Sequence, residues 1–336
     1  MLISIGGVSA YDINEDSCLS LNESSNIDDI SYDDLKISSN EGLEDSIKVS
    51  GVKSNDIIVN SEVSSVKGNE IIVDSSNFDD LSNAINNAGD NTKIIVSGNY
   101  KFNSTLKIMS SNVTLVGTKG TVFDINGIYH MMVGTNGAIE PPLTGINISG
   151  ITFINGKTSD YGGALIIGQS AEGTYIGNCT FENNTAACGS AIYFNGAVDM
   201  YNSSKVFRTA TIENCIFNSN VPIDVVGGCV FVYKYNVTVI NCSLSNSGRG
   251  STTYGFGGGI GVHYGGLTVK DTTFDSNTAQ NGAGIMVQGG DSLDVINCTF
   301  VNNTAGLYGG AIYIVTDTIV KLQYKCKVSV CNSTFI

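Results

Sequence analysis

Short apolar segments with a period of two run through most of the chain after residue 92. Segments 93–98 (KIIVSG), 105–111 (TLKIMSS) and 113–120 (VTLVGTKG) alternate apolar with polar residues, and Gly, Ser and Asn separate them. This alternation is typical of β-strands that bury one face. We therefore predict that the chain consists largely of short strands from this point onward.

One stretch before these strands has helical periodicity instead. Ser76 is expected to be the N-cap, with Asp79 three residues later, and Gly89 is expected to close the helix. The apolar face comprises Phe78, Leu81, Ile85 and Ala88. The spacing predicts one amphipathic helix of about three turns.

A unit of 26 to 36 residues is repeated along the second half of the chain. Each unit has an aromatic residue at the end of an "NCTF"-like phrase and, further on, two small residues before an apolar strand. The aromatic positions are Phe153, Phe181, Phe217, Phe274 and Phe300, with Leu244 in the same slot and Phe335 in the last unit. The glycine pairs are Gly162 and Gly163, Gly227 and Gly228, Gly257 and Gly258, and Gly309 and Gly310, with the variants Gly189-Ser190 and Gly282-Ala283. Such self-similarity indicates a stack in which each unit buries its apolar face against its neighbours.

The residue content of the unit decides between the possible stacks. Helical repeats are excluded because Gly, Asn and β-branched residues disfavour helix interiors. A propeller blade requires about 40 residues and four strands. The unit fits one coil of a solenoid, so we predict an all-β fold: a single-stranded parallel β-helix with a short N-terminal capping helix.

Stacking places equivalent residues of successive coils about 4.8 Å apart, so like residues form columns. The position two residues before the aromatic is expected to point inward. It holds Cys179, Cys215, Cys242 and Cys298, with Ile151 and Thr272 in other coils. The position three residues after the aromatic is expected to take left-handed turn conformations and to share side-chain hydrogen bonds between coils. It holds Asn184, Asn220, Asn277 and Asn303.

The phrase at 297–313, and more loosely at 178–193, resembles the repeat of polymorphic outer-membrane proteins and of the adhesin-like proteins of methanogenic archaea. Residues 78–150 are similar to the capped start of pectate-lyase-like right-handed β-helices. The resemblance covers about residues 67–336. It implies a right-handed β-helix that is exported to the cell surface as a monomeric rod and binds other cells or a polysaccharide.

Two coils depart from the repeat. The coil at 217–233 has Val-Pro-Ile-Asp where the motif has Asn-Thr-Ala, and the coil at 244–263 carries a longer insert. We expect function in these coils, around Pro222 and Tyr254. Flat faces that bear Tyr193, Tyr233 and Tyr313 are the candidate contacts, because aromatic rings can stack on sugars.

Pectinolytic enzymes share the fold that the resemblance implies, so a polysaccharide lyase or glycoside hydrolase that acts on plant-type polysaccharide is the alternative. Either chemistry needs neighbouring carboxylates and a positioned proton donor or acceptor. The acids of the coils are scattered along the sequence. Arg208, with Asp199 and Asp224 near it, is the best remaining catalytic candidate. We expect no enzymatic activity, no cofactor and no metal site.

Charge and hydropathy limit the partners. The net charge is −14, from 17 basic and 31 acidic residues, and this is unsuited to binding nucleic acid or anionic lipid. No apolar run is long enough to predict a transmembrane helix.

The chain divides into regions of different composition. Residues 1–10 (MLISIGGVSA) have the pattern of the end of a secretory signal, although an ordinary frayed terminus is the alternative. Residues 11–66 are expected to be an acidic, disordered linker. Residues 67–144 are the predicted N-terminal cap and first coils, and 145–336 the repeat coils. Phe335 opens a coil that the sequence does not complete, so we expect a C-terminal truncation.

The cysteines and glycan acceptor sites describe the interior and the surface. Nine cysteines lack the spacings of a zinc site or of a disulfide scaffold, and we expect stacked buried thiols with at most one disulfide. Asn-x-Ser/Thr sites are frequent, which fits glycosylation and also fits a preference for turn residues. The acceptor candidates are Asn103, Asn112, Asn178, Asn183, Asn297 and Asn302.

Overall fold

The computed structural model describes most of the chain from residue 69 onward. The described residues are 69–137, 140–196, 207–223, 227–248, 255, 257–315 and 326–336. Before them, the backbone of four short strands is described: β1 (Ile3–Ile5), β2 (Val8–Ala10), β3 (Ser17–Ser20) and β4 (Lys36–Ser39). The predicted signal remnant and linker otherwise lie outside the described residues and stay predictions.

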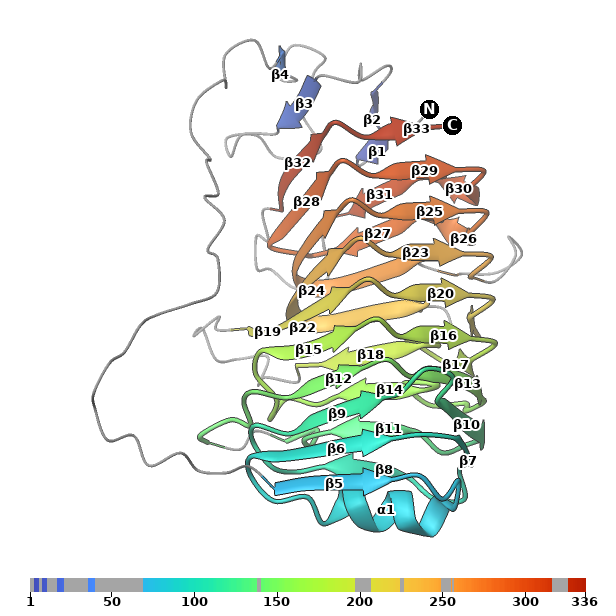
Figure 1. Cartoon of the computed structure of the whole chain (residues 1–336). Helices are drawn as coiled ribbons and strands as arrows, with labels where there is room; N and C mark the ends of the chain where they lie inside the picture. The colour runs from blue at the N-terminus through green and yellow to red at the C-terminus, as the bar shows by residue number, and fades with distance from the viewer. Residues whose placement is uncertain are drawn as a thin grey trace, which may run out of the picture.

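Parallel strands stack along one axis and form three faces around a common core (Figure 1). Face 1 begins next to the helix, and each of its strands pairs in parallel with the next up to β32. Its strands are β5 (Asn69–Val73), β6 (Thr92–Val96), β9 (Thr114–Gly117), β12 (Asn147–Ser149), β15 (Thr174–Gly177), β19 (Arg208–Glu213), β22 (Val230–Ile240), β24 (Ile260–Lys270), β28 (Ser292–Ile296) and β32 (Lys327–Cys331).

Face 2 is a nine-stranded sheet that carries the aromatic positions of the repeat. Register pairs match like with like, as when Phe153 pairs with Phe181 and Phe181 with Phe217. Its strands are β7 (Asn99–Lys101), β10 (Val122–Gly127), β13 (Thr152–Gly156), β16 (Thr180–Glu182), β20 (Ile216–Asn218), β23 (Ser243–Ser245), β25 (Thr273–Asp275), β29 (Thr299–Val301) and β33 (Thr334–Phe335).

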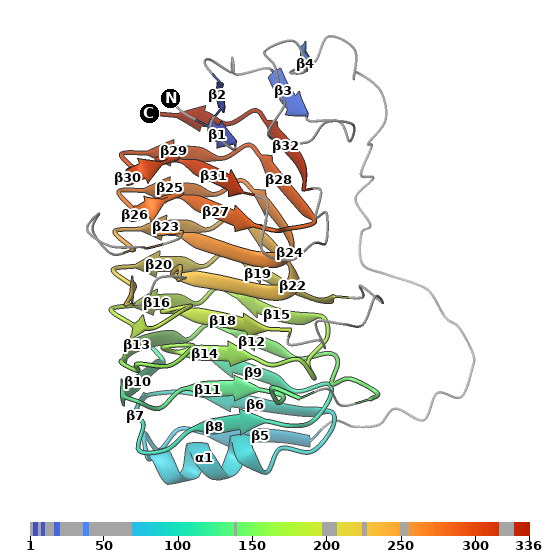
Figure 2. The ribbon, with the colours of Figure 1, turned by 180° about the vertical axis from the view of Figure 1, so that it is seen from behind.

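Face 3 follows the glycine pairs, and Figure 2 shows its strands succeeding one another along the stack. β22 and β24 belong to faces 3 and 1 together, because each runs for 11 residues across the corner between them. The other strands of face 3 are β8 (Leu106–Ile108), β11 (Met131–Val133), β14 (Leu165–Ile167), β18 (Ile192–Asn195), β27 (Ile285–Gln288) and β31 (Ile312–Val315). Two small sheets pair β17 (Thr185–Ala186) with β21 (Val221–Pro222) and β26 (Thr278–Asn281) with β30 (Thr304–Tyr308).

The chain visits the faces in the order 1, 2, 3, so each turn is one coil. β12, β13 and β14 make one coil, and β15 then returns to face 1 beside β12. This arrangement confirms the predicted all-β architecture of stacked parallel strands. The two coils that depart from the repeat contain β22 and β24, the strands that cross a corner.

The helix α1 (Phe78–Asn86) covers one end of the stack (Figure 1). Its predicted apolar residues are buried, and Phe78 packs on Phe102 of the first coil with ring centroids 5.0 Å apart. The predicted caps were wrong. Asn77 is the N-cap, because its side chain accepts a hydrogen bond from the amide of Asp79, while Ser76 has a left-handed φ of 52°. The C-cap is Asn87, so the helix ends before Gly89.

The aromatic column of face 2 fills the interior. Phe153, Phe181 and Phe217 are fully buried, and their ring centroids lie 4.9 to 5.0 Å apart with nearly parallel planes. The same geometry continues from Phe274 to Phe300 and Phe335. Parallel rings whose centroids lie this far apart are offset along their planes, which is one of the arrangements that aromatic pairs prefer. Here the strand spacing imposes it, since equivalent residues recur at about that distance.

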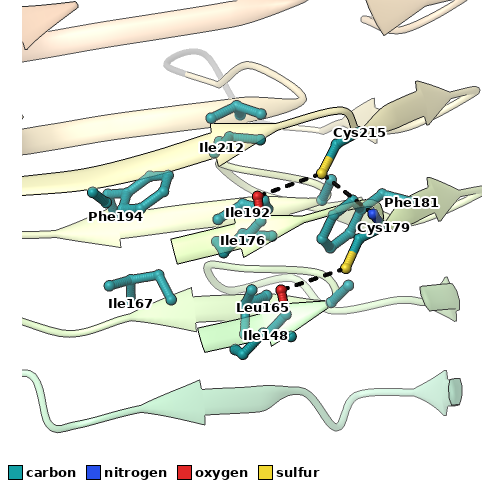
Figure 3. Packing of buried hydrophobic residues seen from close by; sticks show 14 of the residues in the cluster. Ile148, Leu165, Ile167, Ile176, Cys179, Phe181, Ile192, Phe194, Ile212 and Cys215 are labelled. Carbon is teal, nitrogen blue, oxygen red and sulfur yellow. Dashed lines mark hydrogen bonds between the residues drawn. The ribbon is translucent and has the colours of Figure 1, made fainter. Parts of the chain in front are cut away.

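The cysteine column is buried in the same core, and Figure 3 shows Cys179 and Cys215 near Phe181. Cys179, Cys215 and Cys242 are buried free thiols. The sulfur atoms also take part in hydrogen bonds between coils. The amide of Cys179 donates to Sγ of Cys215 at 3.4 Å, and the Cys215 thiol donates to the carbonyl of Ile176 at 3.6 Å. Burial raises the pKa of Cys298 to about 11, so its thiol stays protonated at neutral pH and is a poor nucleophile.

The asparagine column forms a continuous ladder at the turn after face 2. Oδ1 of Asn220 accepts hydrogen bonds from the amide and the side chain of Asn184, at 3.1 and 3.0 Å. Asn303 accepts the same two bonds from Asn277, and Ser247 takes the slot in the coil between. The prediction that these asparagines share side-chain hydrogen bonds between coils is thus confirmed.

The left-handed conformation, however, was assigned to the wrong position. Asn184, Asn220, Asn277 and Asn303 are not among the residues with positive φ; the residue before each of them is. These preceding residues are Asn183 (56°), Ser219 (56°), Ser276 (55°) and Asn302 (53°). The left-handed residue makes the turn and stays at the surface, which directs the next side chain into the stack.

The first glycine of the pair has a left-handed backbone in every coil except that of Gly227, and it bends the chain onto the strand of face 3. Gly309 has φ 61°, and a Cβ there would lie 2.3 Å from the carbonyl oxygen of Ile312. Gly162 and Gly282 have φ 66° and 61° with equally close neighbours. Any side chain would therefore displace the following strand, which explains why glycine recurs at this place.

Candidate binding surface

Aromatic side chains gather on the outer side of face 3. Tyr193 and Phe231 occupy equivalent outward positions in β18 and β22, and their ring centroids lie 5.9 Å apart with planes 4° from parallel. Tyr161, from the loop before β14, stacks on Tyr193 at 4.8 Å. We call this set, together with the neighbouring rings of the next coil, the outer aromatic row: Tyr161, Tyr193, Phe231, Tyr233, His263 and Tyr264.

Strand alternation explains why these rings point outward. In β18 the flanking residues Ile192 and Phe194 are fully buried in the core, so Tyr193 between them lies on the opposite side of the sheet. Tyr193 is nevertheless only 7% exposed, because its neighbours cover it, whereas Tyr161 is 47% exposed. Burial raises the pKa of Tyr193, and the phenol stays protonated at neutral pH. Tyr161 therefore offers the accessible ring of this stack.

A lysine joins the row where β22 and β24 turn from face 3 to face 1. Lys234 and Tyr264 occupy equivalent positions and both have left-handed backbones, with φ 53° and 59°. Nζ of Lys234 lies 5.3 Å from the ring centroid of Tyr233 and 6.0 Å from that of Tyr264. His263 stacks on Tyr264 at 4.2 Å. The corner thus combines aromatic faces with a cation–π contact.

A separate aromatic pair lies further along the same face. Tyr308 stacks on Tyr313 with centroids 5.5 Å apart, and Tyr308 is 50% exposed. The outward column is interrupted between Phe231 and Tyr313, since Gly261 and Met286 occupy the intervening positions. The pair is therefore distinct from the outer aromatic row.

Of the predicted contacts, Tyr193 and Tyr233 belong to the row, and Tyr313 belongs to the separate pair. Sequence reasoning missed the two most accessible rings, Tyr161 and Tyr308. The signal was present, because each stands directly before a glycine pair in the phrase Tyr-Gly-Gly-Ala. Pro222 is buried in β21, and Tyr254 lies outside the described residues.

The weak catalytic candidate Arg208 is held in an ion-pair cluster. Its guanidinium lies 2.6 Å from the carboxylate of Glu140 and 4.0 Å from that of Glu172, and its Nε donates to the carbonyl of Gln169 at 3.3 Å. Arg208 therefore connects two loops to the start of β19. Its sequence neighbours Asp199 and Asp224 lie outside the described residues. Within the described ranges, no three His, Cys, Asp or Glu side chains gather as a metal site would require.

The glycan acceptor candidates lie at corners of the coils. Asn103, Asn112, Asn178, Asn183, Asn297 and Asn302 are all exposed. All but Asn103 have a left-handed backbone, with φ between 52° and 56°. In the phrase Asn178-Cys179-Thr180 the Asn points to solvent, the Cys inward and the Thr outward. The same Asn therefore forms the turn and remains accessible as a glycan acceptor.

Comparison with known proteins does not assign the chain to a family. No model of a known protein family matches the chain, and no solved structure matches it. A curated relative, metabotropic glutamate receptor-like protein R of Dictyostelium discoideum, is 26% identical over 151 residues. The match covers 45% of this chain and only 8% of that protein. Within the described residues, no helix has the length and apolar character of a membrane span.

Proposed function

We propose that the protein is an exported, cell-surface adhesin-like rod that binds polysaccharide through the outer aromatic row. The observation that carries the proposal is the stack of Tyr161 on Tyr193 and Phe231, which presents one half-exposed ring on a rigid sheet. Aromatic faces of this kind pack against the C–H faces of sugars, and a rigid sheet spares the entropy of ordering them.

The proposed rod is a right-handed, single-stranded parallel β-helix of the pectate-lyase type. Crossovers between parallel strands of one sheet are right-handed in nearly all proteins, and every coil makes such a crossover. The resemblance of the repeat to adhesin-like proteins and the exposed acceptor asparagines support export. The proposed rod is monomeric.

The charge favours a neutral polysaccharide as the ligand. The net charge of −14 repels anionic polymers such as polygalacturonate at low salt. Lys234, the cation of the row, is buried against two rings and is poorly placed to meet an anionic sugar in solution. We therefore expect stronger binding to galactomannan or xyloglucan than to polygalacturonate.

The test is binding of the purified full chain to immobilised neutral and acidic polysaccharides, with Tyr161→Ala as the variant. A stacked ring contributes about 0.5–1.5 kcal/mol, so the variant should weaken binding by about 2- to 12-fold. Tyr308→Ala, which removes an equally exposed ring outside the row, is the matched control and should bind like the unmodified protein.

Two results would contradict the proposal. Full affinity of a folded Tyr161→Ala variant would show that the row is not the binding surface. New polysaccharide ends after incubation, with or without calcium, would favour the lyase or hydrolase alternative.

A further inference from the structure

The N-terminal segment reaches the end of the stack that lies opposite α1. β3 pairs antiparallel with β32, and β4 pairs antiparallel with β3. Both views place β3 next to β32 and β4 beyond β3, with α1 at the other end of the molecule (Figures 1 and 2). A segment that precedes the first coil in sequence therefore extends face 1 beyond its last parallel strand.

The register of this pairing brings two cysteines together. Cys18 of β3 lies directly opposite Cys331 of β32. Residues directly opposed in an antiparallel pair have Cα atoms about 4.5–5.5 Å apart, which falls within the range of about 4.4–6.8 Å that a disulfide requires. The backbone alone thus makes a bridge between these positions possible.

The state of the other cysteines leaves the same pair as the possible disulfide. Cys331 is disulfide-bonded. Seven of the nine cysteines of the sequence are not in a disulfide, and six of these seven are buried. The seven are Cys179, Cys188, Cys215, Cys229, Cys242, Cys298 and Cys326. Cys18 is the cysteine that remains.

Cys331 also stands outside the repeat pattern. The interior column position of its coil, two residues before Phe335, holds Ser333, whose hydroxyl accepts a hydrogen bond from the amide of Cys298 at 3.1 Å. Cys331 lies two residues earlier, in register with Ile296 of β28. Its place in the sequence is therefore not explained by the stacking that explains the other cysteines of the column.

We propose that Cys18 and Cys331 form a disulfide that fastens the N-terminal segment across the end of the solenoid as a clasp. The step oxidises two thiols: they lose two protons and two electrons to a disulfide oxidant, which becomes a dithiol, and one S–S bond forms. An export compartment supplies such oxidants. The pairing of β3 also occupies the edge of β32 that faces away from β28, and paired edges do not recruit other chains.

The clasp is tested on the purified full chain, oxidised with glutathione disulfide. After denaturation without reductant, alkylation should label seven thiols, and reduction should expose two more. A peptide that contains residue 18 should be linked to one that contains residue 331 in the non-reduced digest. Backbone hydrogen exchange of residues 327–331 should accelerate at least tenfold on reduction or in Cys18→Ser, with no change in β25 or β29.

Cys326→Ser is the matched control, because it removes a free thiol five residues from Cys331 and should leave the linked peptide in place. Nine labelled thiols in the oxidised protein would overturn the proposal, as would a link between Cys326 and Cys331. Equal exchange in the linked and reduced forms would also overturn it, because β3 would then not protect β32. None of these measurements depends on polysaccharide binding, so the proposed function and the clasp can fail separately.

Discussion

Replacement of Asn220 by alanine tests whether the asparagine ladder holds the coils together. Asn220 is fully buried, and its Oδ1 accepts hydrogen bonds from both the amide and the side chain of Asn184. Its own Nδ2 donates to the carbonyl of Phe181 at 2.9 Å. The substitution therefore removes three hydrogen bonds between neighbouring coils at one buried point.

The cost can be worked from these contacts. The amide of Asn184 loses its acceptor inside the protein, which costs about 1–3 kcal/mol. The two side-chain bonds contribute about 1 kcal/mol each, and part of this is recovered because Nδ2 of Asn184 still donates to the carbonyl of Phe153. We expect a loss of about 3–4 kcal/mol in the free energy of unfolding, measured by urea denaturation with circular dichroism.

The chain itself provides the control substitution. Ser247 fills the same slot in the next coil, and its Oγ accepts a hydrogen bond from the amide of Asn220 at 3.3 Å. Asn220→Ser should therefore keep an acceptor for the amide of Asn184 and lose only the two side-chain hydrogen bonds, which is about 1–2 kcal/mol. Equal destabilisation by alanine and serine would refute the reasoning, because the buried amide would then not be the source of the effect.

Three further predictions concern single side chains. Cys215→Ala should cost about 1–3 kcal/mol in urea denaturation because it removes an acceptor from a buried amide, and Cys215→Ser should cost less. Burial, with a hydrogen bond to Glu213, raises the pKa of Tyr175 to about 12. Its stabilising effect is complete below pH 10 and is lost between pH 10 and 12, so Tyr175→Phe should flatten the fall in stability over that window. In a yeast secretion host, peptide mass spectrometry should find glycan on Asn178, at an exposed corner, and none on Asn147, whose Oδ1 is buried within β12.

The repeat was predictable because a solenoid is quasi-one-dimensional. Each coil contacts mainly the coils next to it, so the spacing from Phe153 to Phe181 translates directly into neighbours in space. The inward cysteines and the hydrogen-bonded asparagines followed from strand alternation for the same reason. The N-cap of α1 and the left-handed residues were misplaced by one position, since several adjacent Ser and Asn residues suit either role.

The sequence by itself determined the periodic parts of this protein: the class of fold, the columns of its core and the coils that depart from the repeat. Only the tertiary structure decided which residues outside the repeat period contact one another. It stacked Tyr161 on Tyr193, paired Arg208 with Glu140, and placed Cys18 opposite Cys331. These contacts join loops and segments far apart in the chain, and their geometry depends on how all the intervening coils are wound rather than on any local pattern.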